Sequence, residues 1–442
     1  MPASPLDSAL YRDLFGDAEL ARLFTDTAEV RAMLLVEGAL AKAQGALGVI
    51  PADSAAFLHR ASLEVQIDPA ALAAETGANA VPVPALVAAF RKALEAPDHA
   101  QWLHWGATSQ DIIDTALMLR LRQVIAIYEA RLAALIATLA QLAETHADLP
   151  MAARTYAQIA TPTSFGAVVA SWGMPLLRHA QRLQNLKADL LLVSLSGASG
   201  TNAAMGPLAP EVRAELARAL NLGDPGANWH SARDTVAAFA SWITGTAQSL
   251  GKIGEDLILL TQSGIEEVRL GSGGGSSTMP QKVNPVAPSV LVALARQMVG
   301  LGANMAGAAL HRQQRDATAW LVEWLTLPQM CLGLGRALLT AQGLADTIAP
   351  DAARMRAALT GGLGLIHAEA LTFALAETMP RPAAQAAVKA LTQEARATGT
   401  PLATLAARDF PGTDWAARLA PEAQMGEAPA EASAFAATTT RT

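Results

Sequence analysis

Apolar residues along this chain recur mostly at helical spacing, and the alternation typical of strands is rare. Alanine and leucine dominate the apolar positions, a bias that favours helix. Asp26 and Glu29 stand three residues apart, as in a capping box, ahead of an apolar stripe that ends at Gly48 and Pro51. The pattern therefore predicts an ordinary helix between these signals.

The longest uninterrupted helical pattern covers 111–149, a stretch without Gly or Pro. As a single helix it would be roughly 55–60 Å long, well beyond the usual globular helix. Further long helices are predicted at 163–195, 228–263, 286–325 and 328–348. Five such helices predict an all-α subunit with a long bundle that also packs against copies of itself.

The positions of proline and glycine residues divide the chain into three predicted domains. The section 1–110 has short elements and five prolines between positions 51 and 97. The long helices fill 111–348, and short helices return in 349–442. At 442 residues, more than one domain is expected. The last ten residues are predicted to be disordered.

Composition narrows the function classes. Charged residues make up only 16% of the chain and hydrophobic residues 52%, which indicates surfaces buried between subunits or helices buried all round. The net charge is −7 and no basic stripe is present, so nucleic acid is excluded as a partner.

Sequence features also indicate the compartment. Cys331 is the single cysteine, which excludes a disulfide framework and fits a reducing compartment. The N-terminus lacks a basic region followed by an apolar one, so no secretory signal is expected. The most apolar window, 290–310, contains Arg296, Gln297 and Asn304, which argues against a membrane span. We expect a cytoplasmic protein.

The segment 271–285, GSGGGSSTMPQKVNP, carries the densest candidate chemistry. A Gly/Ser run alone is usually a flexible linker. It also makes a poor phosphate loop, because no Gly-Lys-Ser/Thr follows and no strand-like run precedes it. The rest of the segment is unlike a linker, since it ends in a Met-Pro step, one lysine and an Asn-Pro step.

Two prolines stiffen the end of this segment. Pro280 and Pro285 restrict the residues before them to extended geometry, so Lys282 and Asn284 are expected on a fixed stretch. We expect the Gly/Ser run to be a mobile lid. The segment then supplies a proton carrier in the hydroxyl of Ser276, a cation in Lys282 and an amide donor in Asn284. Acid–base chemistry beside a carboxylate needs these groups.

A second polar cluster, HWGATSQD at 104–111, precedes the longest helix. In the simplest interpretation Thr108 or Ser109 caps the helix and Asp111 interacts with its dipole. Exposed N–H groups at a helix start also form an anion site, which the flanking hydroxyls would extend. His104 alone would more often be structural than catalytic.

Three further clusters carry cationic or polar side chains: 154–158 with Arg154 and Gln158, 229–234 with His230 and Arg233, and 312–316 with Arg312 and Arg315. The first precedes a proline break and is expected on a loop, where such residues are often simply solvated. The last lies within the predicted helix 286–325. No metal motif, GxSxG elbow or GxGxxG fingerprint is present, so no metal, flavin or nicotinamide is expected.

Three motifs in order resemble the signature regions of one family. HWGATSQDIIDTA, RTYAQIATPTSFG and GSSTMPQKVNP are similar to those of the fumarase/aspartase superfamily, which includes argininosuccinate and adenylosuccinate lyases. The resemblance extends from about Leu14 to the Ala-rich tail. It implies a three-domain, all-helical subunit with a central five-helix bundle. It also implies a homotetramer with a twenty-helix core, in which three subunits share each active site.

The resemblance assigns roles to residues that match the family's motifs. Ser276 matches the catalytic serine of the mobile loop. Lys282 and Asn284 match the pair that grips a substrate carboxylate, and His104 matches a site histidine of the adenylosuccinate-type members.

Further residues are implied in substrate binding. Thr108 and Ser109 match carboxylate ligands of the first region. The remaining candidates are cationic or polar side chains that would contact an anionic substrate: Arg154, Tyr156, Gln158, His230, Arg233 and Arg315.

Departures from the family pattern narrow the implied activity. Tyr156 stands where lyases of the superfamily usually have histidine, and 79–84 lacks the His-Asp dipeptide of adenylosuccinate lyases. These features, with Trp105 after His104, resemble the cycloisomerase branch, which interconverts 3-carboxy-cis,cis-muconate and 4-carboxymuconolactone in protocatechuate breakdown. The resemblance thus implies a small tricarboxylate substrate. The alternative is an adenylosuccinate- or argininosuccinate-type lyase that releases fumarate.

Overall fold

The computed structural model describes residues 4–271, 273–275 and 278–439. Contacts divide the chain into two compact units, each assembled from three segments. Unit 1 consists of Met1–Arg131, His179–Gln248 and Ala293–Leu338, and unit 2 of Leu132–Arg178, Ser249–Val292 and Leu339–Thr442. The division into domains at 110 and 348 stays a prediction.

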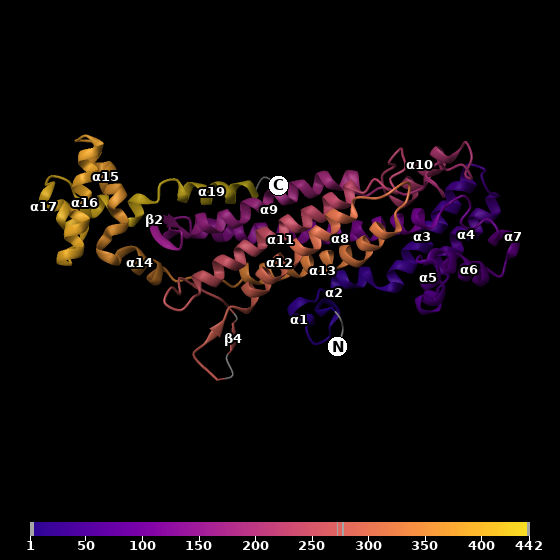
Figure 1. Cartoon of the computed structure of the whole chain (residues 1–442), viewed down its shortest axis with the longest axis horizontal. Helices are drawn as coiled ribbons and strands as arrows, with labels where there is room; N and C mark the ends of the chain where they lie inside the picture. Colours follow the sequence, from indigo (N-terminus) through magenta and orange to yellow (C-terminus); the bar gives the residue numbers. More distant parts are fainter. Residues whose placement is uncertain (1–3, 272, 276–277, 440–442) are drawn as a thin grey trace. The chain divides into compact units, whose positions relative to one another are not determined.

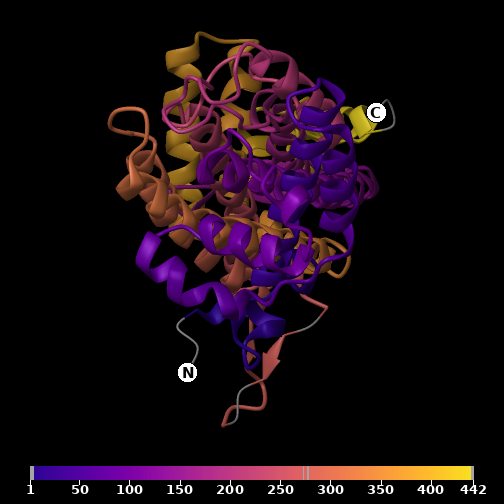
Figure 2. The ribbon, with the colours of Figure 1, turned by 90° about the vertical axis from the view of Figure 1, so that its right-hand side faces the viewer.

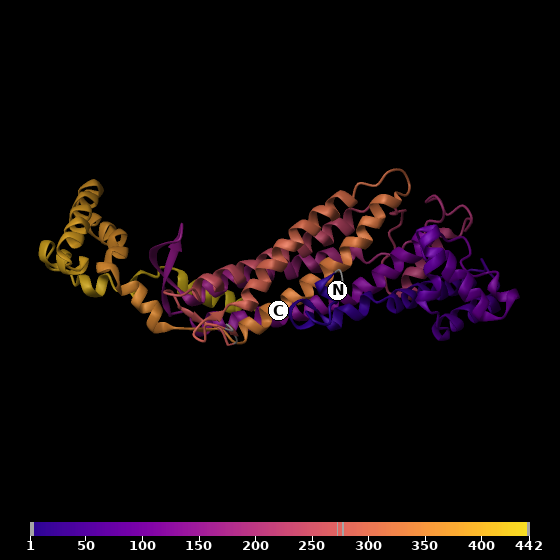
Figure 3. The same cartoon turned by 60° about the horizontal axis from the view of Figure 1, so that its bottom comes forward.

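Five long helices organise the chain, as the sequence predicts. They are α8 (Ser109–Thr145), α9 (Phe165–Leu190), α11 (Asp234–Leu260), α12 (Val286–Ala308) and α13 (Ala317–Ala345). Figure 3 shows α11, α12 and α13, coloured salmon to orange, running side by side. By length and composition alone, two of the described helices, α8 and α12, could cross a membrane.

Buried polar side chains fasten the long helices to one another within each unit. In unit 1 the hydroxyl of Tyr128 on α8 donates to the carbonyl of Cys331 on α13 at 2.6 Å. In unit 2 the indole N–H of Trp172 on α9 donates to Asp256 on α11 at 2.8 Å. These bonds satisfy polar atoms in surroundings that are otherwise apolar.

The predicted boundary between the fourth and fifth helices is wrong. The helices break at 309–316, whereas Pro328 lies inside α13. Proline removes one backbone hydrogen bond from a helix, but α13 buries Leu327, Met330 and Cys331 around it, and this burial favours a continuous helix. Arg312 and Asp316 hold the break through paired hydrogen bonds of 2.6 and 3.1 Å.

Short helices of unit 1 pack around one apolar core (Figure 2, indigo to violet). Helix α3 (Asp26–Ala46) begins after Thr25, whose hydroxyl accepts from the N–H of Ala28, and it ends before Gly48, which has a φ of +72°. The other short helices are α1 (Arg12–Phe15), α2 (Ala18–Ala21), α4 (Ala52–Glu64), α5 (Ala73–Asn79), α6 (Val83–Leu94), α7 (Pro97–Ala100) and α10 (Ala209–Leu220).

The described strands are short and belong to unit 2. Strands β1 (Pro150–Thr155) and β2 (Gln158–Ser164) form a hairpin where the sequence predicts a loop. Strand β3 (Val268–Arg269) pairs with β6 (Ala349–Pro350), and β4 (Gly274–Gly275) pairs with β5 (Val283–Asn284).

The C-terminal helices of unit 2 surround a core of their own, seen in Figure 1 as the yellow cluster of α15, α16 and α17. Its helices are α14 (Ala352–Thr360), α15 (Ala368–Ala376), α16 (Arg381–Thr398), α17 (Leu402–Asp409) and α18 (Trp415–Arg418). Of the ten residues predicted to be disordered, 433–439 instead belong to α19 (Ala428–Thr439), and the rest lie outside the described residues. Phe435 is buried there, against Gly173 of α9, because that glycine leaves room for its ring.

Candidate active site

The first turn of α8 positions a hydroxyl beside a cation. Thr108 precedes the helix, and its N–H donates to the carboxylate of Asp111 at 3.0 Å, as in a capping box. The Thr108 hydroxyl is therefore not needed as a cap, and it accepts from a terminal guanidinium nitrogen (Nη2) of Arg315 at 3.3 Å. Arg315 also donates to Gln110 Oε1 at 2.9 Å. With Ser109 half-buried beside them, these groups suit a carboxylate ligand.

A single buried carboxylate organises the chain behind this turn. Asp111 is 1% exposed, and one oxygen accepts from His230 Nε2 and from the N–H of Ser196, both at 2.8 Å. Its other oxygen, Oδ2, accepts from the N–H of Gly197 at 3.0 Å. Ser194 Oγ lies 3.4 Å from Oδ1, the oxygen that also accepts from His230. Asp111 thus connects segments that are far apart in the sequence.

His230 is a second member of this buried network. Its side chain is 1% exposed, and Nε2 is committed to Asp111. Its other ring nitrogen is buried and has no hydrogen-bond partner within the described residues. In this chain the sequence candidate His230 therefore contacts Asp111, and its role toward substrate stays a prediction.

Arg233 is not free to bind a substrate, contrary to the sequence expectation. It is fully buried between Asp114 and Glu323, with bonds of 2.7 Å to the first and 2.6 and 2.9 Å to the second. Burial by itself lowers the pKa of Arg233, but the two carboxylates outweigh it and raise this pKa. Gln110 Nε2 donates to Asp114 at 3.1 Å, so this network continues to the first turn of α8.

His104 is paired with a carboxylate that the sequence did not indicate. Its Nδ1 lies 2.7 Å from Oε1 of Glu37 on α3, which is 1% exposed. Burial lowers the pKa of His104, but the charge of Glu37 and the hydrogen bond to it outweigh burial and raise this pKa. The imidazole is 19% exposed, so it can exchange protons with a ligand.

In unit 2, Arg154 forms a two-pronged ion pair with Glu267 across bonds of 2.7 and 2.8 Å. Glu267 is 1% exposed, which makes the pair a buried anchor for strand β1. Glu267 therefore occupies the edge of the guanidinium, formed by its two terminal nitrogens, that would otherwise bind a substrate carboxylate. The substrate role of Arg154 stays a prediction.

The β1–β2 hairpin presents Tyr156 to solvent. Tyr156 and Ala157 form its turn, with φ of 51° and 59°, and the Tyr156 side chain is fully exposed. Positive φ at two successive residues matches the twist of a two-residue hairpin. Gln158 is exposed on the next strand and donates to the carbonyl of Ala157.

The hairpin β4–β5 carries Lys282 and Asn284. Lys282 is exposed in the turn, where its N–H donates to the carbonyl of Met279 at 3.0 Å, and Asn284 is half-buried and paired with Gly274. A side chain at Gly274 would put its Cβ 2.6 Å from Val286, so glycine fits this pairing. Ser276 lies outside the described residues.

The candidate residues thus fall into two groups. Unit 1 holds His104, Thr108, Ser109, His230 and Arg315, and unit 2 holds Arg154, Tyr156, Gln158, Lys282 and Asn284. The first group contains a hydroxyl beside a guanidinium, at Thr108 and Arg315, and a histidine whose pKa is raised. Over the described ranges, no group of three His, Cys, Asp or Glu side chains is placed to hold a metal ion.

Sequence reasoning missed the carboxylates that support these residues. Glu37 and Glu267 were not singled out, because each lies in a helix or loop without any motif. Their partners, His104 and Arg154, are 67 and 113 residues away. The only signal in the sequence is a charge in an apolar stretch, as with Glu37 between Val36 and Gly38.

Known proteins resemble this chain over most of its length. Residues 14–300 match the model of the lyase family. The chain is 42% identical to a 3-carboxy-cis,cis-muconate cycloisomerase of Pseudomonas aeruginosa, with 85% of this chain and 83% of the relative covered. It is 32% identical to an N-acetyl-S-(2-succino)cysteine lyase of Dickeya dadantii, with 87% and 85% covered.

A solved structure shares the fold. The 3-carboxy-cis,cis-muconate lactonizing enzyme from Pseudomonas putida superposes with a TM-score of 0.92 at 34% identity, covering 98% of this chain and 99% of that one. Together with the family match and the three ordered motifs, this agreement places the chain in the lyase family of the fumarase/aspartase superfamily.

Proposed function

We propose that this protein interconverts 3-carboxy-cis,cis-muconate and 4-carboxymuconolactone. The observation that carries this proposal is the similarity of nearly the whole chain to a relative that bears this activity in its name. The cluster of Thr108 and Arg315 supports it, because a hydroxyl beside a guanidinium suits a substrate carboxylate. The reaction belongs to protocatechuate breakdown through the β-ketoadipate pathway.

The chemistry is an intramolecular addition. One carboxylate oxygen of the substrate forms a C–O bond to a double bond that another carboxylate activates, and the α-carbon then takes up a proton. In the reverse direction the α-proton leaves and the carboxylate departs, a β-elimination. The forward reaction takes up one proton and the reverse reaction releases it, and no other reactant is consumed.

The transition state carries extra negative charge on the activating carboxyl group. Stabilising such charge is usually the largest catalytic contribution. We assign this role to Lys282 and Asn284, while Ser276 transfers the α-proton. An alkoxide at Ser276 needs a neighbouring cation and loop N–H groups, and Lys282 is the cation on the same segment. The raised pKa of His104 supports its role as a second proton carrier.

We assign the other carboxylates to the remaining candidate residues. Thr108, Ser109 and Arg315 hold one carboxylate, and Arg154, Tyr156, Gln158 and His230 complete the candidate set. The protein has a net charge of −7, so binding a trianion requires such local concentration of cations and donors.

We infer that a homotetramer assembles the site, with each active site shared by three subunits. Helix α12 supports this, because Gly300 and Gly307 have nothing within 4 Å of a Cβ position, which leaves a face of small residues unpartnered. Arg296, Gln297 and Asn304 are also exposed on α12, a pattern that suits helix contact better than lipid. The three-domain division at 110 and 348 and a cytoplasmic location belong to the same proposal.

An absorbance assay tests the activity. Purified protein is mixed with 3-carboxy-cis,cis-muconate without added metal, and in parallel with adenylosuccinate. Loss of the diene absorbance with a lactone as product is the expected result. Release of fumarate from adenylosuccinate, with no change in the muconate, would instead make the protein a lyase.

The second candidate is a lyase that cleaves a succinyl adduct. The similarity to the N-acetyl-S-(2-succino)cysteine lyase favours it, and the same Ser276, Lys282 and Asn284 would serve elimination. Tyr156 counts against it, because the histidine usual in these lyases is absent. The assay extends to this candidate by including N-acetyl-S-(2-succino)cysteine as a third substrate.

A further inference from the structure

Unit 1 contains a cationic pocket of about 440 Å³ between α3, α4, α8 and α10. Five side chains that can carry positive charge line it: Arg31, Lys42, His59, Arg120 and Arg122. None of its lining residues is a carboxylate, although the protein as a whole has a net charge of −7. We call this cavity the basic pocket.

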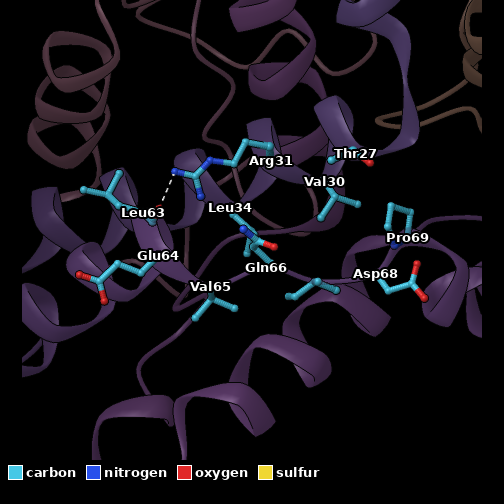
Figure 4. A pocket seen from close by; sticks show the side chains of 11 residues that line it. Thr27, Val30, Arg31, Leu34, Leu63, Glu64, Val65, Gln66, Asp68 and Pro69 are labelled. Atoms are coloured by element: carbon cyan, nitrogen blue, oxygen red, sulfur yellow. Dashed lines mark hydrogen bonds between the residues drawn. The ribbon is translucent and has the colours of Figure 1, made fainter.

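Two of the cations have a structural reason to be there. Arg31 donates to the carbonyls of Ser62 and Leu63 at 2.6 and 3.0 Å, near the end of α4. Figure 4 shows the contact with Leu63 from the adjoining cavity, with the carboxylate of Glu64 pointing away from the guanidinium. Arg122 donates in the same way to the carbonyl of Asn221 at 2.9 Å, after α10. Such contacts satisfy carbonyls at helix ends, and among the described residues neither guanidinium forms an ion pair with a carboxylate.

The other three groups, Arg120, His59 and Lys42, are less completely paired. Arg120 is 7% exposed and its Nε atom has no partner within the described residues. Its single ion pair there, to Glu29, is long at 3.5 Å. His59 has a buried Nδ1 that also lacks a partner, and Lys42 forms no ion pair with any described residue. Unpartnered buried polar atoms are costly, so a bound group that pairs with Arg120 Nε and His59 Nδ1 would stabilise the fold. Lys42 is exposed and would contribute its charge.

Charge effects point in the same direction. Burial lowers the pKa of Arg120, although the charge of Glu29 opposes it. Burial and then the charge of Lys42 lower the pKa of His59, although a backbone hydrogen bond to Gly38 opposes them. In both groups the stabilising contributions do not offset burial, so their protonated forms are short of counter-charge. An anion in the pocket would supply it.

The remaining lining of the pocket is apolar. Leucine and alanine side chains provide it, among them Leu23, Leu35 and Leu119. A ligand that fits both parts has a flat or compact apolar body and a carboxylate. We propose that the basic pocket is a second ligand site, which binds a small carboxylate with an apolar body, for which benzoate is a probe. None of the candidate active-site residues lines it, so the site is separate from the substrate site.

Binding of benzoate to the full-length protein tests the proposal. Isothermal titration calorimetry is run with benzoate and with benzamide, its neutral counterpart of similar shape. We expect benzoate to bind and benzamide to bind at least about tenfold more weakly, because the charge contributes most of the recognition. Lys42→Glu is expected to weaken benzoate binding by at least about tenfold, since it reverses a charge at the pocket.

Two control variants show whether benzoate binding depends on the basic pocket. Lys92→Glu makes the same charge change on an exposed residue of α6 outside the pocket, and benzoate should bind to it as to the wild type. Arg315→Gln alters the substrate site, and it should leave benzoate binding unchanged. The proposal is overturned if benzoate does not bind, if Lys42→Glu binds it normally, or if only Arg315→Gln loses it.

Discussion

Oε1 of Glu37 lies 2.7 Å from Nδ1 of His104, so a buried carboxylate on α3 orients the imidazole at the entrance to α8. Glu37 is 67 residues away in the sequence. Its second oxygen, Oε2, is buried and has no hydrogen-bond partner among the residues described. The charge of Glu37 is therefore directed mainly at His104.

We expect Glu37→Gln to lower the pKa of His104. The charge of Glu37 and its hydrogen bond are what raise this pKa against the effect of burial, and an amide removes the charge. An NMR titration of the His104 ring measures the change directly. An unchanged His104 pKa in Glu37→Gln, with Glu64→Gln as the exposed control, would contradict the assignment.

The same pair should make stability depend on pH. A histidine whose pKa is raised by folding stabilises the protein fully below its unfolded-state pKa, and that contribution is lost as pH rises through the raised value. Wild type should therefore exceed Glu37→Gln in free energy of unfolding by more at about pH 5.5 than at about pH 8.5, either side of the ordinary histidine pKa. Urea denaturation at both values provides the measurement.

Asp111→Asn should destabilise the protein. The carboxylate accepts from three backbone N–H groups and from His230, and an amide would direct its own N–H group at some of these donors. We expect a loss of about 2–4 kcal/mol in the free energy of unfolding, the range for a buried charged hydrogen-bond partner. Asp189→Asn, at an exposed position of α9, should change stability little in the same urea titration.

Ser276→Ala should lower turnover at least about a hundredfold, the usual effect of losing acid–base catalysis. The oligomeric state and the melting temperature should be unchanged, because the substitution removes a single hydroxyl. Ser277→Ala is the matched neighbour and should keep most of the activity. Near-normal turnover in Ser276→Ala would exclude it as the proton carrier.

Tyr156→Phe should lower kcat/KM by about tenfold without affecting stability, the size expected for one lost hydrogen bond to an anion. The side chain is fully exposed within its own chain, so it contributes no packing that the substitution could disturb. Tyr156→His tests whether histidine can replace it. Equal rates in wild type and the Phe variant would remove the hydroxyl from the mechanism.

Gly300→Arg on α12 should shift the protein to smaller assemblies. No atom lies within 4 Å of a Cβ at Gly300, so the folded chain can accept the side chain, whereas a helix packed on that face cannot. Light scattering after gel filtration measures the mass. Gly77→Arg on α5, where space is equally open, is the control, and an unchanged assembly in Gly300→Arg would contradict the proposed interface.

Local sequence signals predicted the presence of the helices better than the residues at which the helices begin and end. The five long helices follow from runs of helix-forming residues, and the start of α11 at Asp234 follows from polar residues before an apolar stretch. Pro328 misled the prediction, because a proline inside a well-packed helix does not end it. The tail was missed because Phe435 is held by Gly173, a contact that no local pattern reveals.

By itself the sequence determined the helical class, the three motifs and the candidate residues Thr108, Lys282 and Asn284, since these depend on neighbours within a few positions. The tertiary structure alone decided which carboxylate meets which cation. Glu37 pairs with His104, Glu267 with Arg154, and Asp111 with His230 across 67, 113 and 119 residues. Such pairs form only when packing brings distant helices and loops together, because the cost of burying each charge is offset by its partner.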